Sequence, residues 1–137
     1  MGIAPYINFD GTCREAVEFY AKVFKTAAPR IMTFGEAPPN PAFAIPEAAK
    51  KLIIHAEIDV LGSVIMFSDV PPGMSLVKGN NLSITIQSGS ADELTLWFNA
   101  MKEGGTVIMQ LGPQSWSGLY GFVTDKFGVG WQFSLAG

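Results

Sequence analysis

The residues best suited to chemistry in this chain are His55 and Glu57, which stand two positions apart in a segment rich in β-branched residues. On a β-strand, residues two positions apart point to the same face, so the imidazole and the carboxylate are expected side by side. Such a pair can perform general acid–base catalysis, or it can be a hydrogen-bonded wall without a reaction to perform. His55 is the only histidine, so the chain cannot supply a multi-histidine metal site.

Cys13 is a second residue whose type could do chemistry. It follows Thr12 at the predicted start of a helix, where the helix dipole favours a thiolate. No histidine lies near it in the sequence to act as its base, so we interpret Cys13 as a small buried residue. Because it is the only cysteine, an internal disulfide is impossible.

Two aromatic residues and two carboxylates complete the set of candidates. Trp116 and Tyr120 flank residues 117–119 and could stack on a flat ligand, on the proline-rich loop or on a partner subunit. Asp69 and Asp125 follow strand-like segments, and we interpret them as caps of turns or strand ends.

The elements that must position these residues come in two copies. Residues 31–35 recur as 108–112, and the same shift of 77 positions carries residues 7–9 onto 84–86. The shift also aligns two helical stripes: Val17, Tyr20, Ala21 and Phe24 with Leu94, Trp97, Phe98 and Met101. Internal repeats of this kind indicate two related modules in a pseudo-twofold arrangement.

Each copy predicts the element order β-α-β-β-β. The predicted strands are residues 5–9, 30–34, 52–60 and 63–68, then 82–87, 106–111, 119–124 and 129–135. Both closing hairpins turn on an Asp-x-x-Gly motif, at residues 59–62 and 125–128. We therefore expect one α+β domain over residues 1–137, with module one at about 1–70, a linker at 71–79 and module two at about 80–137.

Each predicted helix begins with a possible capping box. Thr12 with Glu15 and Ser90 with Glu93 have the required spacing, and the second helix should run to about Lys102. The proline-rich residues 35–49 predict a loop with one helical turn after Pro46.

Alternation along the strands predicts one apolar and one polar face. The apolar set, expected beneath the helices, is Ile7, Phe9, Ile65, Phe67, Leu82, Ile84, Ile86, Trp131 and Phe133. The polar set is Tyr6, Asn8, His55, Glu57, Met66, Ser68, Asn81, Ser83, Thr85, Gln87, Gln132 and Ser134. Polar inner faces of two curved sheets can line a cleft, so we expect a small polar ligand there. Its expected contacts are Tyr6, Asn8, Met66, Ser68, Thr85, Trp116, Tyr120 and Gln132.

Composition narrows the class of partner. The 137 residues are 48% hydrophobic and only 15% charged, with a formal net charge of −3. A negative charge argues against nucleic acid, and no apolar run reaches the roughly 18 residues of a membrane span. No signal peptide is recognisable, so we expect a cytoplasmic protein. So little charge predicts exposed apolar surface, and hence a homodimer.

Four stretches resemble the PhnB-like branch of the vicinal oxygen chelate superfamily, which includes glyoxalase I, extradiol dioxygenases and the fosfomycin- and bleomycin-resistance proteins. They are Pro5-Tyr6-Ile7-Asn8-Phe9 with Gly11 and Ala16, Ile54-His55-Ala56, Ile65-Met66-Phe67-Ser68-Asp69, and residues 121–129 with Trp131. The resemblance implies a glyoxalase-like fold of paired βαβββ modules forming a half-barrel. Members of this branch are often labelled as 3-demethylubiquinone-9 3-methyltransferase-like, but this sequence lacks a glycine-rich strand-to-helix turn for a nucleotide-like methyl donor.

The resemblance also identifies where metal-dependent relatives carry His or Glu ligands. Those positions hold Ala4 or Pro5, Met66, Asn81 and Gln132 here, so we expect no metal or other cofactor. The expected function is therefore metal-free binding of a small molecule. The alternative is a lyase, transferase or oxygenase of the vicinal oxygen chelate type that uses His55 and Glu57, with or without a relocated divalent metal.

Overall fold

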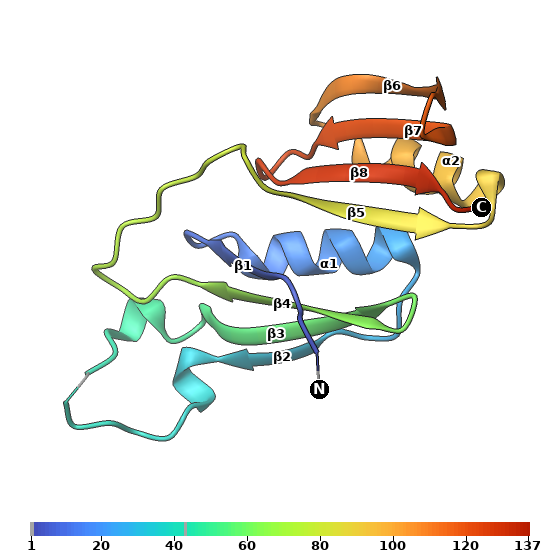
Figure 1. The fold of residues 1–137 in the computed structure, drawn as a ribbon. Helices are drawn as coiled ribbons and strands as arrows, with labels where there is room; N and C mark the ends of the chain where they lie inside the picture. The colour runs from blue at the N-terminus through green and yellow to red at the C-terminus, as the bar shows by residue number, and fades with distance from the viewer. Residues whose placement is uncertain (1, 43) are drawn as a thin grey trace. The chain divides into compact units, whose positions relative to one another are not determined.

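The computed structural model describes residues 2–42 and 44–137. The chain divides into two compact units, residues 1–77 and 78–137. Each described unit has the element order β-α-β-β-β, so the predicted α+β class and the doubled module are confirmed (Figure 1). No helix in the described part of the chain combines the length and apolar character needed to cross a membrane.

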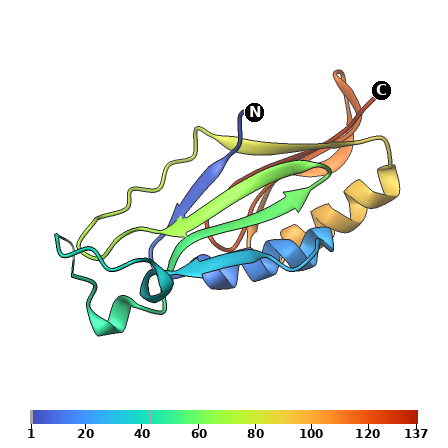
Figure 2. The same ribbon diagram turned by 90° about the horizontal axis from the view of Figure 1, so that it is seen from below.

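The first unit is a four-stranded sheet with a helix along one face (Figures 1 and 2). Its elements are β1 (Tyr6–Phe9), α1 (Cys13–Phe24), β2 (Arg30–Thr33), β3 (Ile53–Val60) and β4 (Ser63–Asp69). The strand order is β1-β4-β3-β2, with β1 parallel to β4 and the other pairs antiparallel. Two short 3-10 turns, Phe34–Glu36 and Glu47–Ala49, interrupt the connection from β2 to β3, and the second is the predicted turn after Pro46.

The second unit repeats this plan. Its elements are β5 (Ser83–Ser88), α2 (Ala91–Met101), β6 (Thr106–Gln114), β7 (Ser117–Thr124) and β8 (Gly130–Leu135). The strand order β5-β8-β7-β6 matches that of the first unit, and β5 runs parallel to β8. The two sheets therefore have one topology, as the repeat predicts.

The helical stripes form the two cores. In the first unit Tyr20 is fully buried and stacks on Phe67 of β4, with ring centroids 5.7 Å apart. In the second unit Phe98 meets Phe133 of β8 edge to face at 6.0 Å. Leu82 was expected in the apolar layer, and that prediction is wrong. Its side chain is 85% exposed because β5 begins only at Ser83, so alternation does not govern its direction.

Asp69 links the helix to the sheet in the first unit. This carboxylate is 2% exposed and accepts hydrogen bonds from the backbone N–H of Cys13 (3.0 Å) and of Ile53 (2.9 Å). It therefore caps the start of α1, a role that the sequence assigned to Thr12. The predicted Thr12–Glu15 capping box is absent because Asp69 takes its place. The interpretation of Asp69 as a cap is confirmed.

The second predicted capping box forms only in half. The Ser90 hydroxyl accepts a hydrogen bond from the Glu93 N–H at 3.2 Å, as expected. The Glu93 carboxylate accepts instead from the Ser88 hydroxyl at 3.0 Å. A complete capping box occurs where none was predicted, between Thr33 and Glu36 at the first 3-10 turn.

The two Asp-x-x-Gly hairpins differ. In the first, Leu61 and Gly62 form a two-residue turn with φ of 52° and 82°, and Asp59 remains inside β3. In the second, five residues separate the paired Thr124 and Gly130, so Asp125 lies in the turn itself. The motif therefore encodes two different turns.

Candidate functional site

The polar face of the first sheet presents one row of residues across all four strands. Tyr6 of β1 pairs with Met66, Met66 pairs with Glu57, and Glu57 pairs with Arg30 of β2. Successive side chains along a strand point to opposite faces of the sheet. Ala56, which precedes Glu57, is fully buried toward the helix, so Glu57 points to the other face. The side chains of Tyr6, Met66, Glu57 and Arg30 therefore lie away from α1.

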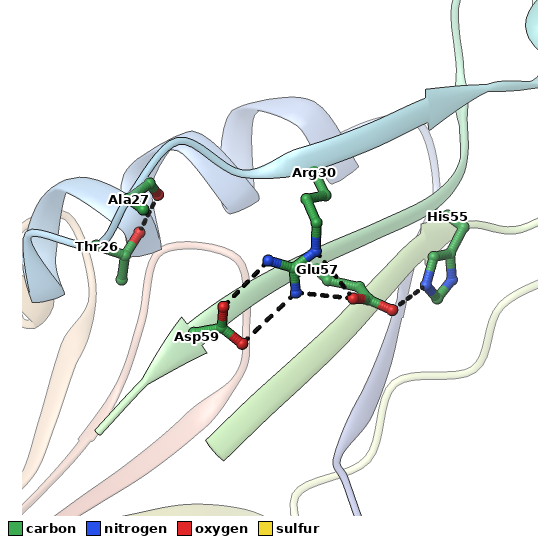
Figure 3. Close-up of polar contacts among 6 residues, drawn as sticks. All are labelled: Thr26, Ala27, Arg30, His55, Glu57 and Asp59. Carbon is green, nitrogen blue, oxygen red and sulfur yellow. Dashed lines mark hydrogen bonds and ion pairs between the residues drawn. The ribbon is translucent and has the colours of Figure 1, made fainter. Parts of the chain in front are cut away.

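A chain of hydrogen bonds and ion pairs crosses this face, and Figure 3 shows its part from His55 through Glu57 and Arg30 to Asp59. The Tyr6 hydroxyl lies 3.1 Å from Nδ1 of His55, and Nε2 of His55 lies 3.0 Å from Oε2 of Glu57. The other Glu57 oxygen accepts from Nε (3.1 Å) and Nη2 (2.8 Å) of Arg30. Nη1 of Arg30 donates to Oδ2 of Asp59 at 3.0 Å, so the guanidinium joins two carboxylates. We call Tyr6, His55, Glu57, Arg30 and Asp59 the sheet-one network.

The charged groups of the network stabilise one another's ionised forms. Hydrogen bonds from His55 and then from Arg30 lower the pKa of Glu57, so its carboxylate is ionised at neutral pH. Hydrogen bonds to Asp59 and Glu57 raise the pKa of Arg30 further above its ordinary range. The side chains remain accessible, with exposed fractions of 26% for Glu57 and 39% for His55. Exposed ion pairs contribute little to stability, so this network is not needed to hold the sheet together.

The remaining expected ligand contacts of the first unit lie on the same face. The Ser68 hydroxyl donates to Oδ1 of Asn8 at 2.9 Å, and the two residues are paired across β1 and β4. Met66 lies between Tyr6 and Glu57 in the row and offers only a thioether. The first unit therefore brings together Tyr6, Asn8, His55, Glu57, Met66 and Ser68.

The expected contacts of the second unit lie on the second sheet. The Tyr120 hydroxyl donates to Oε1 of Gln132, and Nε2 of Gln132 donates to the Ser83 hydroxyl at 2.6 Å. Thr85 is paired with Gln132 across β5 and β8. Trp116 lies edge-on to Tyr120 with ring centroids 5.2 Å apart. Burial raises the pKa of Tyr120, which is 7% exposed, whereas Trp116 is 63% exposed.

Two members of the sheet-one network were not recognised in the sequence. Arg30 and Asp59 stand 29 positions apart, and nothing local joins them. The register between β2 and β3 sets Arg30 opposite Glu57, and this pairing is visible only in the structure. Opposite charges directly across an antiparallel pair are a favourable combination.

A pocket at one end of the first unit was also not predicted. It has a volume of about 1220 Å³ and lies between the proline-rich loop and the segment after β4. Its lining is mainly apolar and includes Phe34, Pro38, Pro39, Ile45, Ile54, Pro71, Pro72 and Met74. Lys50 also lines the pocket, and its Nζ pairs with Glu47 at 2.8 Å.

The residues at the positions where the metal-dependent proteins named above carry ligands do not fit a divalent cation. The Gln132 amide uses its oxygen and its nitrogen in the hydrogen bonds to Tyr120 and Ser83. Met66 offers a soft thioether, which suits hard divalent ions poorly. Among residues 2–42 and 44–137, no group of three or more His, Cys, Asp or Glu side chains is placed to hold a metal ion.

Cys13 is confirmed as a buried residue, with 0% of its surface exposed. Burial, and then the charge of Asp69, raise the pKa of its thiol from 9.0 to about 12. We therefore expect Ellman's reagent to leave Cys13 unmodified in the folded protein at about pH 8 and to titrate one thiol in urea. Rapid modification of the folded chain would contradict this burial.

The raised thiol pKa also predicts a loss of stability at alkaline pH. Between pH 9 and about 12 the unfolded chain has lost the Cys13 proton and the folded chain retains it. The unfolded state binds fewer protons, so the free energy of unfolding falls as pH rises through this range. Urea titrations of wild type and Cys13→Ala should show a smaller alkaline loss in the variant. Parallel curves would show that the thiol is not responsible.

The fold and its polar faces define a class: an α+β protein of paired βαβββ modules with the glyoxalase-like fold. The chain belongs to the family described as 3-demethylubiquinone-9 3-methyltransferase, whose family model matches residues 1–134. It is 29% identical to protein YjdN of Escherichia coli K12, over 98% of this chain and 95% of that protein. The resemblance to the PhnB-like branch, predicted from four short stretches, is thereby confirmed.

Solved structures share the fold. The structure of protein PA1353 from Pseudomonas aeruginosa matches with a TM-score of 0.86 and 34% identity, over 98% of this chain and 97% of that chain. A PhnB protein from Bacillus cereus matches with a TM-score of 0.77 and 24% identity, over 99% and 100%. The fosfomycin resistance protein FosX from Listeria monocytogenes shares only the fold, with a TM-score of 0.64 and 13% identity over 100% and 94%.

Proposed function

We propose that this protein binds a small polar molecule on the polar face of its first sheet, without a metal ion. The observation that carries the proposal is the continuous sheet-one network, which joins side chains of three strands on an accessible face. A chain with only 15% charged residues places four charged or ionisable groups and a tyrosine in contact there.

A structural role does not explain this concentration of polar groups. Both Arg30 and Asp59 are more than half exposed, and ion pairs of that exposure contribute little to stability. Holding long side chains in one geometry costs conformational entropy. What the arrangement does provide is a fixed set of hydrogen-bonding atoms, which is what recognition of a polar ligand requires.

The test is a thermal-shift screen of polar metabolites and antibiotics against wild type, followed by equilibrium dialysis of each hit. We expect a hit to raise the melting temperature of the wild type and to bind Glu57→Gln about tenfold more weakly. This substitution removes the negative charge that orients His55 and Arg30, so the hydrogen-bonding atoms offered to the ligand are no longer held in one geometry.

The matched control is Glu47→Gln, the same change of side chain, which removes the ion pair with Lys50. That pair has the same 2.8 Å separation as the pair between Arg30 and Glu57 but lies outside the polar face. Hits should bind this variant like the wild type. Equal weakening in both variants, or no stabilising molecule in the panel, would count against the proposal.

A second candidate function is acid–base catalysis, which the 3.0 Å contact between His55 and Glu57 favours. A carboxylate that orients a histidine is a common arrangement for proton transfer. Once a substrate is found, His55→Ala should bind it and lose turnover. Full turnover in this variant would rule out His55 as the acid or base.

A further inference from the structure

We propose that Tyr6 is the residue through which this face selects its ligand. Its oxygen accepts a hydrogen bond from a hydroxyl or other X–H group of the bound molecule, and Tyr6, His55 and Glu57 act as a proton relay. This inference rests on the proposed function of the same face and specifies the class of molecule: one that presents a hydrogen-bond donor.

The first step is the direction of the hydrogen bonds. An ionised carboxylate can only accept, so the bond between Glu57 and His55 places the proton on Nε2 of the ring. In the neutral imidazole the other nitrogen, Nδ1, is then an acceptor. The Tyr6 hydroxyl, 3.1 Å away, must therefore donate its hydrogen to Nδ1.

Arg30 fixes this direction from the other side. Its guanidinium donates to the Glu57 oxygen that does not contact His55, and it donates to Asp59 as well. Glu57 therefore stays in place and charged, and its second oxygen stays aimed at Nε2. Arg30 acts as a positioning residue, because it touches neither Tyr6 nor His55 in the described contacts.

The second step concerns what remains available to a ligand. Both ring nitrogens of His55 are engaged, so the imidazole offers no free polar atom. The Tyr6 oxygen has given away its hydrogen but keeps lone pairs, and Tyr6 is 47% exposed. Met66, which is paired with Tyr6 on the neighbouring strand, has no hydrogen-bond donor in its side chain. The accessible polar atom at this end of the network is thus an acceptor.

The third step follows when the ligand group is acidic. The X–H proton passes to the Tyr6 oxygen as the Tyr6 proton passes to Nδ1 of His55. The products are the ligand anion and an imidazolium beside the Glu57 carboxylate, so protons and charge balance without another reactant. The relay explains why a histidine with two occupied nitrogens can still take part in proton transfer.

The direct test is ¹⁵N NMR of the ligand-free protein at about pH 8.5, where a single histidine makes the assignment unambiguous. We expect the tautomer with the proton on Nε2. Tyr6→Phe should move the Nδ1 resonance toward that of an unbonded nitrogen, and Glu47→Gln should leave it unchanged. The opposite tautomer in wild type, or an unmoved Nδ1 resonance in Tyr6→Phe, would overturn the relay.

Ligand selection is tested with phenol and anisole, which share a ring and an oxygen but differ in the donated hydrogen. Titrations followed by the His55 ring signals should give phenol an affinity about three- to tenfold higher than that of anisole, the effect of one hydrogen bond. The difference should vanish in Tyr6→Phe. Equal responses to the two probes in wild type, including none, would overturn the selection by Tyr6.

The experiments distinguish a failure of the proposed small-molecule binding from a failure of the Tyr6 relay. The tautomer is read without a ligand, so the opposite tautomer overturns the relay and leaves small-molecule binding intact. The expected tautomer together with a metabolite panel that yields no binder overturns the proposed function and retains the hydrogen-bond directions.

Discussion

Asp125→Ala is expected to lower the free energy of unfolding by about 3 to 5 kcal/mol in urea titrations followed by circular dichroism. The Asp125 carboxylate is 3% exposed and accepts three hydrogen bonds: from the N–H of Phe127 (2.8 Å), from the N–H of Val129 (3.0 Å) and from Nε1 of Trp131 (2.8 Å). Alanine leaves these donors without that acceptor, two of them in buried bonds, and each unsatisfied buried group costs about 1 to 3 kcal/mol.

The matched control is Asp59→Ala, at the equivalent position of the other Asp-x-x-Gly motif. The Asp59 side chain is 53% exposed, and its partner Arg30 keeps its bonds to Glu57. We expect a change of no more than about 1 kcal/mol. Similar losses for Asp59→Ala and Asp125→Ala would mean that burial does not govern the effect.

Gly105→Ala is expected to destabilise the protein by about 2 to 3 kcal/mol, since a side chain there meets backbone atoms. A Cβ atom at Gly105 would lie 2.3 Å from the carbonyl oxygen of Thr124 and 2.9 Å from Cα of Asp125. Neither atom belongs to a flexible side chain, so the start of β6 and the end of β7 must move apart. The same movement would disturb the turn that Asp125 holds together.

The control for this prediction is Gly89→Ala in the same unit. A Cβ atom at Gly89 would meet nothing within 4 Å, and its φ is not in the left-handed region. Urea titration of this variant should give a free energy of unfolding within about 0.5 kcal/mol of the wild type. A neutral Gly105→Ala would show that β6 and β7 separate easily at this point.

Much of the fold could be predicted from local patterns. The helical stripes around Tyr20 and Phe98 mark the buried faces of α1 and α2, because the 3.6-residue period is a property of the helix itself. The repeat of the first module in the second predicts the same element order for both, whereas the order of strands within each sheet comes from the structure. The helix caps were less predictable, since Asp69, 56 positions away from Cys13, competes with the local Thr12 side chain.

The candidate site was predictable only in part. The two-residue spacing of His55 and Glu57 places them on one strand face, and the structure joins them directly. Whether Tyr6 would be their partner depends on β1 adding beside β4, which is a non-local pairing. Arg30 was missed for the same reason, because its contact with Glu57 depends on the register of β2 on β3.

By itself, the sequence determined the doubled βαβββ plan, the buried stripes and the pairing of a histidine with a carboxylate, because these depend on periods of a few residues. The tertiary structure alone decided that Asp125 is a buried cap while Asp59 is a surface ion-pair partner. It also decided that one hydrogen-bonded chain runs from Tyr6 to Arg30. Both outcomes depend on turn length and strand register, which are set by the packing of whole elements and not by neighbouring residues.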